Sequence, residues 1–164
     1  MKNCIGWERF DKLNFSEYIE KLADNLVLTY RLRNTDISLN KDLEEDLFLD
    51  MDTAIPLGTI INELISNSFK YAFPGRDKGE IQIKLHREES KCKDCMNINF
   101  ILSVSDNGVG IPENFDIKNL DSLGLRLVTS LVEQLDGKLE LKRNSGTELI
   151  IRFTVIEKRN KISD

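Results

Sequence analysis

Three polar side chains at helical spacing are the first residues of this sequence whose types suit chemistry. Glu63 and Asn67 are four residues apart, and Asn67 and Lys70 are three apart, so all three project from one side of a helix. The opposite stripe is apolar and contains Ile61, Leu64, Ile65 and Phe69. A carboxylate, an amide oxygen and an ammonium in a row suit a hydrated magnesium ion and the phosphates that it bridges. The alternative interpretation is a solvated polar helix face.

A second motif follows an apolar stretch and reads Asp-Asn-Gly-Val-Gly, from Asp106 to Gly110. A carboxylate at the end of a buried strand can accept a hydrogen bond from an exocyclic amine. Gly108 and Gly110 would let the backbone approach a flat ring closely, because they carry no Cβ. Taken alone, the motif is also compatible with an ordinary turn.

Two weaker motifs complete the set. Ser122-Leu-Gly-Leu125 opens a helical stretch, and amide groups at a helix N-terminus suit phosphate oxygens. A plain helix start would have the same pattern. Gly146-Thr147 stands at the start of the last strand, and such pairs are common in hairpins, so it carries no meaning by itself.

Regular elements must position these motifs. Helical periodicity begins at Asn14, which with Glu17 fits a capping box. The predicted helices are residues 14–30, 53–72 and 123–135, and the predicted strands are residues 37–39, 47–51, 80–86, 98–105, 139–143 and 149–156. This order predicts one α+β domain, a two-layer α/β sandwich with a mixed sheet and helices on one face. Strands and helices do not alternate strictly, so a doubly wound nucleotide-binding fold is not expected.

Together the four motifs resemble the ATP-binding core shared by gyrase-type topoisomerases, the ninety-kilodalton heat-shock chaperone, mismatch-repair ATPases and sensor histidine kinases. The resemblance covers residues 15–155 and is greatest for histidine kinases with a short nucleotide lid, since few residues separate Pro112 from Gly124. It implies a Bergerat-type fold, with a mostly antiparallel sheet covered on one face by three helices. It also implies ATP and magnesium as ligands.

The resemblance also implies a role for each motif residue. Asn67 would bind magnesium, Glu63 would orient or deprotonate the attacking group, and Lys70 would meet the phosphates. Asp106 would take the adenine amino group. The other residues implied to bind the nucleotide are Tyr71, Gly108, Gly110, Gly124, Leu125 and Thr147. Ser122 stands where many members have glycine, which is a departure from the family pattern.

The phosphate acceptor is expected to lie outside this chain. Such kinases phosphorylate a histidine on an upstream helix pair, whereas His86 falls on a predicted strand. The expected partners are therefore a histidine-bearing dimerisation domain and, downstream, a response regulator. Two alternatives stay open: an anti-sigma-like serine kinase, and a nucleotide-gated interaction module without catalysis.

Composition limits the remaining possibilities. The 164 residues carry a net charge of −5, which argues against a nucleic-acid surface. No apolar run approaches the ~20 residues that cross a bilayer and no signal peptide is apparent, so we expect a cytoplasmic domain without membrane contact. Residues 14–157 are the predicted catalytic domain, between a connection at 1–13 and a polar tail at 158–164. Cys92 and Cys95 are interpreted as loop thiols.

Overall fold

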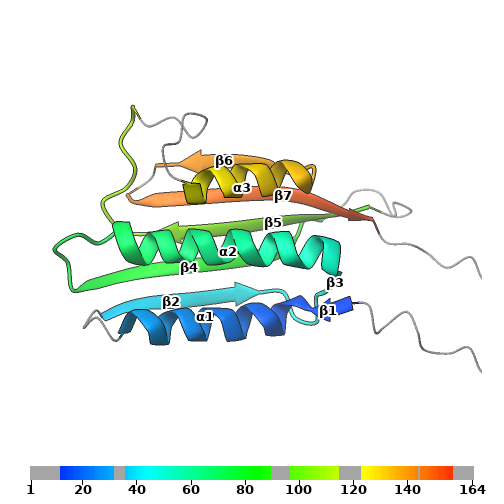
Figure 1. The fold of residues 1–164 in the computed structure, drawn as a ribbon, viewed down its shortest axis with the longest axis horizontal. Helices are drawn as coiled ribbons and strands as arrows, with labels where there is room; N and C mark the ends of the chain where they lie inside the picture. Colours follow the sequence, from blue (N-terminus) through cyan, green and yellow to red (C-terminus); the bar gives the residue numbers. More distant parts are fainter. Residues whose placement is uncertain (1–11, 32–35, 90–96, 115–122, 144, 157–164) are drawn as a thin grey trace, which may run out of the picture.

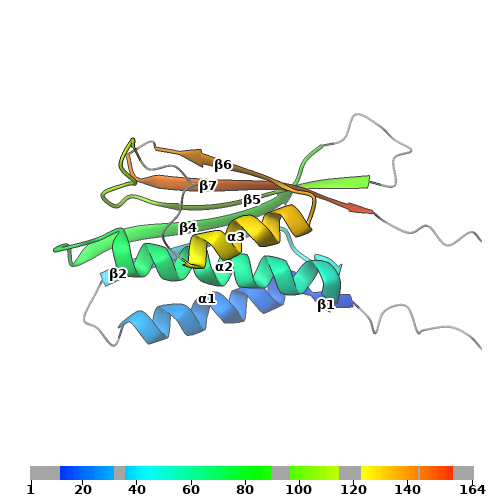
Figure 2. The same ribbon diagram turned by 45° about the horizontal axis from the view of Figure 1, so that its top comes forward.

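The computed structural model describes residues 12–31, 36–89, 97–114, 123–143 and 145–156. They form two layers, a five-stranded sheet and three helices that cover one of its faces (Figures 1 and 2). The predicted fold class is confirmed. Within the described ranges, no helix is long and apolar enough to cross a membrane.

The main sheet has the strand order β2-β4-β5-β7-β6. These strands are β2 (Asp36–Leu43), β4 (Lys78–Arg87), β5 (Asn97–Asp106), β7 (Thr147–Ile156) and β6 (Lys138–Lys142). β2 pairs with β4 in parallel, and the other three pairings are antiparallel. The sheet is therefore mixed and mostly antiparallel, as predicted.

The helices are α1 (Phe15–Arg31), α2 (Met51–Tyr71) and α3 (Leu123–Gln134). α2 begins at the expected place because the carboxylate of Asp50 accepts a hydrogen bond of 3.0 Å from the backbone N–H of Thr53. In α1 the corresponding acceptor is Asn14, whose side-chain oxygen lies 3.2 Å from the N–H of Glu17. One half of the predicted capping box is thus present, while the carboxylate of Glu17 pairs with Lys21.

The core lies between the helices and one face of the sheet. Alternate residues of the long strands are buried there, as the period of a strand requires. The fully buried side chains include Phe15, Ile19, Leu57, Ile60, Ile61, Ile65, Ile81, Ile83, Leu85 and Phe100. The polar residues between them on each strand point to the other face of the sheet.

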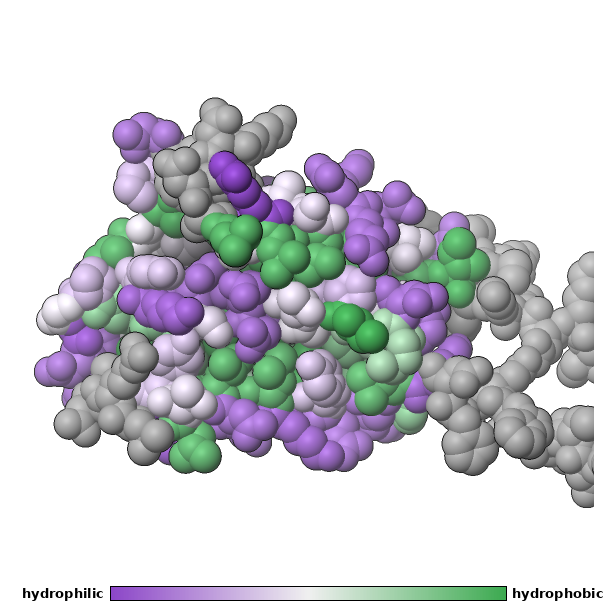
Figure 3. All heavy atoms as spheres, in the orientation of Figure 1, coloured by the Kyte–Doolittle hydropathy of each residue, from purple (hydrophilic) through white to green (hydrophobic). Residues whose placement is uncertain are grey.

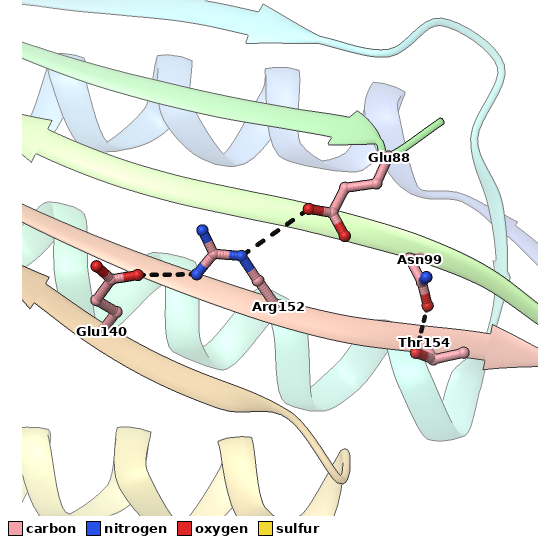
Figure 4. Close-up of polar contacts among 5 residues, drawn as sticks. All are labelled: Glu88, Asn99, Glu140, Arg152 and Thr154. Atoms are coloured by element: carbon pink, nitrogen blue, oxygen red, sulfur yellow. Dashed lines mark hydrogen bonds and ion pairs between the residues drawn. The ribbon is translucent and has the colours of Figure 1, made fainter. Parts of the chain in front are cut away.

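That other face is crossed by polar contacts between strands (Figure 4). Arg152 on β7 donates to Glu140 on β6 at 2.8 Å and lies 3.9 Å from Glu88. Thr154 donates to the side-chain oxygen of Asn99 on β5 at 2.7 Å. The side of the sheet without helices therefore carries polar pairs between strands, although Ser103 and Ile150, which are paired there, are buried.

Two parts of the predicted topology are wrong. The stretch 47–51 was expected beside the main sheet, but β3 (Phe48–Asp50) pairs antiparallel with β1 (Lys12–Asn14) in a separate two-stranded sheet. β1 itself falls in a stretch without a visible period. The strand predicted at 37–39 is also too short, because β2 continues to Leu43, opposite Leu85 of β4.

The sandwich has two distinct ends (Figure 1). β1 begins and β7 finishes at one end. The C-terminus of α2, the N-terminus of α3, the end of β5 and the start of β7 lie at the other end. The described residues of the four predicted motifs lie toward that second end, on or beside α2 and the ends of β5 and β7 that meet it.

Lys41 joins β2 to α1 and carries a testable consequence for stability. Its ammonium lies 2.6 Å from Glu20 and 2.7 Å from Asp24, and the hydrogen bonds that it donates to Asp24 and then to Glu20 raise the pKa of Lys41. Lys41→Met should lower the free energy of unfolding by about 0.5 to 1 kcal/mol, as for other surface ion pairs. Because the pKa of Lys41 is higher in the folded protein, the ion pairs stabilise the fold fully at pH values below the unfolded pKa of about 10.4. This stabilisation is lost as the pH rises through the pKa of the folded state.

Urea unfolding of both proteins between pH 7 and 11 checks this expectation. The difference between them should be constant up to about pH 9 and shrink above about pH 10. Lys21→Met is the control, since Lys21 makes one exposed pair with Glu17. Equal losses for the two variants would contradict the role given to Lys41.

Candidate functional site

Helix α2 presents the predicted polar stripe beside the start of α3. Glu63 and Asn67 are partly buried, while Lys70 is exposed at the C-terminal end of the helix. A Cβ built on Gly124 would lie 2.6 Å from Oε2 of Glu63 and 3.9 Å from Nδ2 of Asn67. Glycine at this position therefore lets the first turn of α3 approach both side chains, and the two motifs form one site.

Asp106 ends β5 on the helix side of the sheet. Its Oδ2 accepts a hydrogen bond of 3.0 Å from the hydroxyl of Ser68 on α2. Its Oδ1 accepts a hydrogen bond of 3.0 Å from the backbone N–H of Gly108. The carboxylate is thus oriented from both sides, and each oxygen keeps further acceptor capacity.

The glycine loop after Asp106 packs against the C-terminus of α2. The N–H of Val109 donates to the carbonyl of Ala72 at 2.8 Å. A Cβ on Gly108 would lie only 2.1 Å from the same carbonyl oxygen. This position requires glycine for a close approach of two backbones, which supports its place in the predicted site.

The same loop contacts the start of β7. Gly110 has φ +76°, and a Cβ there would lie 3.1 Å from the carbonyl oxygen of Gly146. Thr147 pairs with Asp106 in the ladder between β5 and β7, so both side chains lie on one face of the sheet. The structure therefore brings the Asp-Asn-Gly-Val-Gly motif and the Gly-Thr pair together.

Asn107 fixes this corner to β4 and was not singled out from the sequence. Its side-chain oxygen accepts from the N–H of Glu80 at 2.9 Å, and its own N–H donates to the carbonyl of Glu80 at 3.1 Å. These two bonds continue the pairing of β4 with β5 beyond Asp106. The usual preference of Asn for turns gave the only signal for this residue.

Ser68 was also missed, although it stands next to Asn67. Its burial and its bond to Asp106 follow from the pairing of α2 with the end of β5, which a one-dimensional pattern does not contain. A serine on the otherwise apolar side of a helix was the available signal.

The remaining predicted residues occupy the rim or lie elsewhere. Tyr71 is 69% exposed at the end of α2, and Leu125 packs against the core in the first turn of α3. Ser122 and the two cysteines of the Cys-x-x-Cys pair lie outside the described residues. His86 lies on a strand, as predicted: it is exposed on β4, where its Nε2 lies 2.8 Å from Oδ1 of Asp42.

A polar hollow of about 320 Å³ lies on the other face of the sheet. Gln82, Lys84 and Glu148 contribute to its lining. These residues alternate with the buried side chains of β4 and β7, so they point away from the helices. The hollow therefore opens away from Glu63 and Asn67, but Asp106 and Thr147 also line it, so it adjoins the candidate site at the end of β5 and the start of β7.

Comparison with known proteins agrees with this arrangement. Residues 52–157 match the family described as histidine kinase-, DNA gyrase B- and HSP90-like ATPases. Sensor histidine kinase PdtaS of Mycobacterium tuberculosis is 31% identical over 150 residues, which are 88% of this chain and 28% of that protein. Serine-protein kinase RsbW of Listeria innocua is 27% identical over 105 residues, which are 60% of this chain and 64% of that protein.

Among solved structures, the histidine kinase domain of the blue-light activated histidine kinase of Erythrobacter litoralis EL346 has a similar fold. The TM-score is 0.75 at 25% identity, over 86% of this chain and 61% of that one. The chain spans less than a third of the length of PdtaS. Since the family match extends over more than half of the sequence, the chain belongs to the histidine kinase-, DNA gyrase B- and HSP90-like ATPase family.

Proposed function

We propose that this chain binds ATP with magnesium and transfers the γ-phosphoryl group to a histidine supplied by another domain. The observation that carries the proposal is the meeting of all four motifs at one end of the sandwich. Asp106 is held by Ser68 and Gly108, and Gly124 lies against Glu63. Asp106, the proposed base-recognition group, and Gly124, in the proposed phosphate-recognition motif, thus both adjoin α2, at Ser68 and at Glu63.

Each residue has a separate task in this proposal. Asp106 accepts the adenine amino group, while the loop of Gly108 and Gly110 and the side chain of Thr147 adjoin the base. Backbone amides of Gly124 and Leu125, at the start of α3, receive phosphate oxygens. Lys70 and Tyr71 lie at the exposed end of α2, where the ammonium adds positive charge near the phosphates.

Magnesium fits the donor set at this place, because Asn67 offers a hard amide oxygen and is accessible to water and phosphate. When bound, the ion would neutralise charge on the phosphates during transfer. Glu63, one helical turn before Asn67, is placed to orient the attacking group or to accept its proton. Positioning and charge neutralisation then account for most of the catalysis.

The acceptor histidine is assigned to a separate dimerisation domain. His86 is paired with Asp42 on the sheet face away from the helices, so it does not reach the proposed phosphate site. The helix side offers a surface for a partner, because Leu123 and Leu127, one turn apart on α3, are 84% and 39% exposed. Figure 3 shows hydrophobic side chains gathered on the helix side of the molecule. A histidine-bearing helix could pack against these side chains beside Glu63. A response regulator would receive the phosphate afterwards.

A serine acceptor is the second candidate, and the similarity to the serine-protein kinase RsbW favours it. The two acceptors differ in chemistry, because phosphohistidine is labile in acid and phosphoserine is stable. Acid treatment of the labelled product therefore separates them.

Calorimetric titration with ATP and magnesium tests the proposal. We expect a dissociation constant between about 1 μM and 1 mM, the usual range for enzyme substrates. Asp106→Asn should weaken ATP binding with little loss of folding, because an amide presents donors where the carboxylate presents acceptors only. A folded, unsubstituted protein that binds neither ATP nor ADP would overturn the proposal. Equal affinities for ATP and GTP would contradict the role of Asp106.

A further inference from the structure

Ser68 is the residue of the site to which the family motifs give no task. It lies on α2 immediately after Asn67 and is only 9% exposed. Its hydroxyl stands 3.0 Å from Oδ2 of Asp106 on β5. Alanine would fill nearly the same space on a buried helix face, so packing alone does not account for a hydroxyl here.

The pair of Ser68 and Asp106 has few hydrogen-bond donors to offer a ligand. An ionised carboxylate only accepts hydrogen bonds, and a serine hydroxyl has a single proton to donate. Because that proton is directed at Asp106, the hydroxyl has only acceptor lone pairs left. Oδ1 of Asp106 already receives the N–H of Gly108. The pair therefore offers acceptors alone to a ligand beside it.

We propose that Ser68 is a positioning residue that sets the base specificity of the site. It holds the Asp106 carboxylate so that the remaining lone pairs accept the exocyclic amine of adenine. Because the hydroxyl already donates its proton to Asp106, it cannot also donate to a keto oxygen at the same position of another purine. This inference rests on the proposed nucleotide function, and it adds the group that enforces the choice of base.

The position of Ser68 supports this role over a purely structural one. The bond joins α2 to the end of β5, beside the contact of Val109 with Ala72, so it fixes the carboxylate relative to the loop that adjoins the base. Ser66 is a natural comparison, because it is 8% exposed on the same helix. Two residues along a helix correspond to a rotation of roughly 200°, so Ser66 points away from Asp106.

The test compares ATP with purine riboside triphosphate, which has hydrogen in place of the 6-amino group. Ser68→Ala should weaken ATP binding about tenfold, equivalent to about 1.4 kcal/mol. Binding of the analogue should change less than about twofold, because it makes no amine contact for Asp106 to lose. Ser68→Cys has the same shape with a slightly larger side chain but donates weakly, so it should behave like Ser68→Ala. Ser66→Ala should leave both affinities unchanged.

The outcomes separate this role from its alternatives. Equal loss of both ligands in Ser68→Ala, or unchanged ATP binding, would overturn the specificity role and leave the proposed ATP binding standing. Normal ATP selectivity in Ser68→Cys would also overturn it, because volume would then be sufficient. If the unsubstituted chain bound neither nucleotide, the proposed function would fail and this role with it. Thermal unfolding of each variant identifies any that fails to fold.

Discussion

Asn67→Ala is expected to abolish phosphoryl transfer while the protein stays folded. The proposed magnesium ligand is the amide oxygen of Asn67, and charge neutralisation by the ion accounts for several kcal/mol of transition-state stabilisation. Since each 1.36 kcal/mol is a factor of ten in rate, transfer should fall at least about 1000-fold. The measurement is the transfer of labelled phosphate to a separately produced histidine-bearing dimerisation domain.

Glu63→Gln should differ from Asn67→Ala in a defined way. An interaction made mainly during transfer lowers the rate more than the affinity, so transfer should slow with a smaller loss of ATP binding. Asn25→Ala, at an exposed asparagine of α1, is the matched control and should transfer normally. Undiminished transfer by Asn67→Ala would exclude the magnesium role. Acid-stable self-labelling that survives His86→Ala would instead favour a serine or threonine acceptor.

Gly108→Ala should damage stability and nucleotide binding together. The added Cβ would lie 2.1 Å from the carbonyl oxygen of Ala72, so the loop must move away and the Val109 N–H loses its partner. Overpacking and the lost hydrogen bond together should cost about 2 to 4 kcal/mol of unfolding free energy. Because Gly108 also donates to Asp106, ATP affinity should fall more than about tenfold.

Gly75→Ala is the control for this substitution. Gly75 has φ +68° and no atom within 4 Å of an added Cβ, so only backbone strain of about 1 to 2 kcal/mol is expected. ATP affinity should not change, and urea unfolding with parallel calorimetry measures both quantities. If Gly108→Ala lost no more stability than Gly75→Ala, the close approach to Ala72 would not hold in solution.

Much of this architecture could be predicted because long elements carry strong periods. α2 shows a polar stripe at three- and four-residue spacing, and β4 alternates strictly, so both were located to within a few residues. Gly124 was associated with phosphate binding by its place at a helix N-terminus, while Gly146 was associated with the site only through the family resemblance. Each position has a structural reason for glycine: an added Cβ would meet Glu63 at Gly124 and the carbonyl of Asp106 at Gly146. These contacts join elements that are far apart in sequence.

Short elements and lateral contacts could not be predicted in this way. β1 and β3 have three residues each, too few for a period to stand out, and they are defined by pairing with one another. β2 looked shorter because Lys41 and Asp42 resemble a turn, while its length is set by the partner strand β4. The contact of Ser68 with Asp106 belongs to the same class, since its partners are 38 residues apart.

The separation of the two ends of the sandwich has a practical consequence for biosensor design. β1 begins and β7 finishes at the end opposite Asp106 and the first turn of α3 (Figure 1). A surface tether or reporter protein attached before β1 or after β7 would therefore anchor the domain by its far side. Tethered at either point, the domain would keep the C-terminus of α2 and the N-terminus of α3 directed toward the solution, where a nucleotide arrives by diffusion.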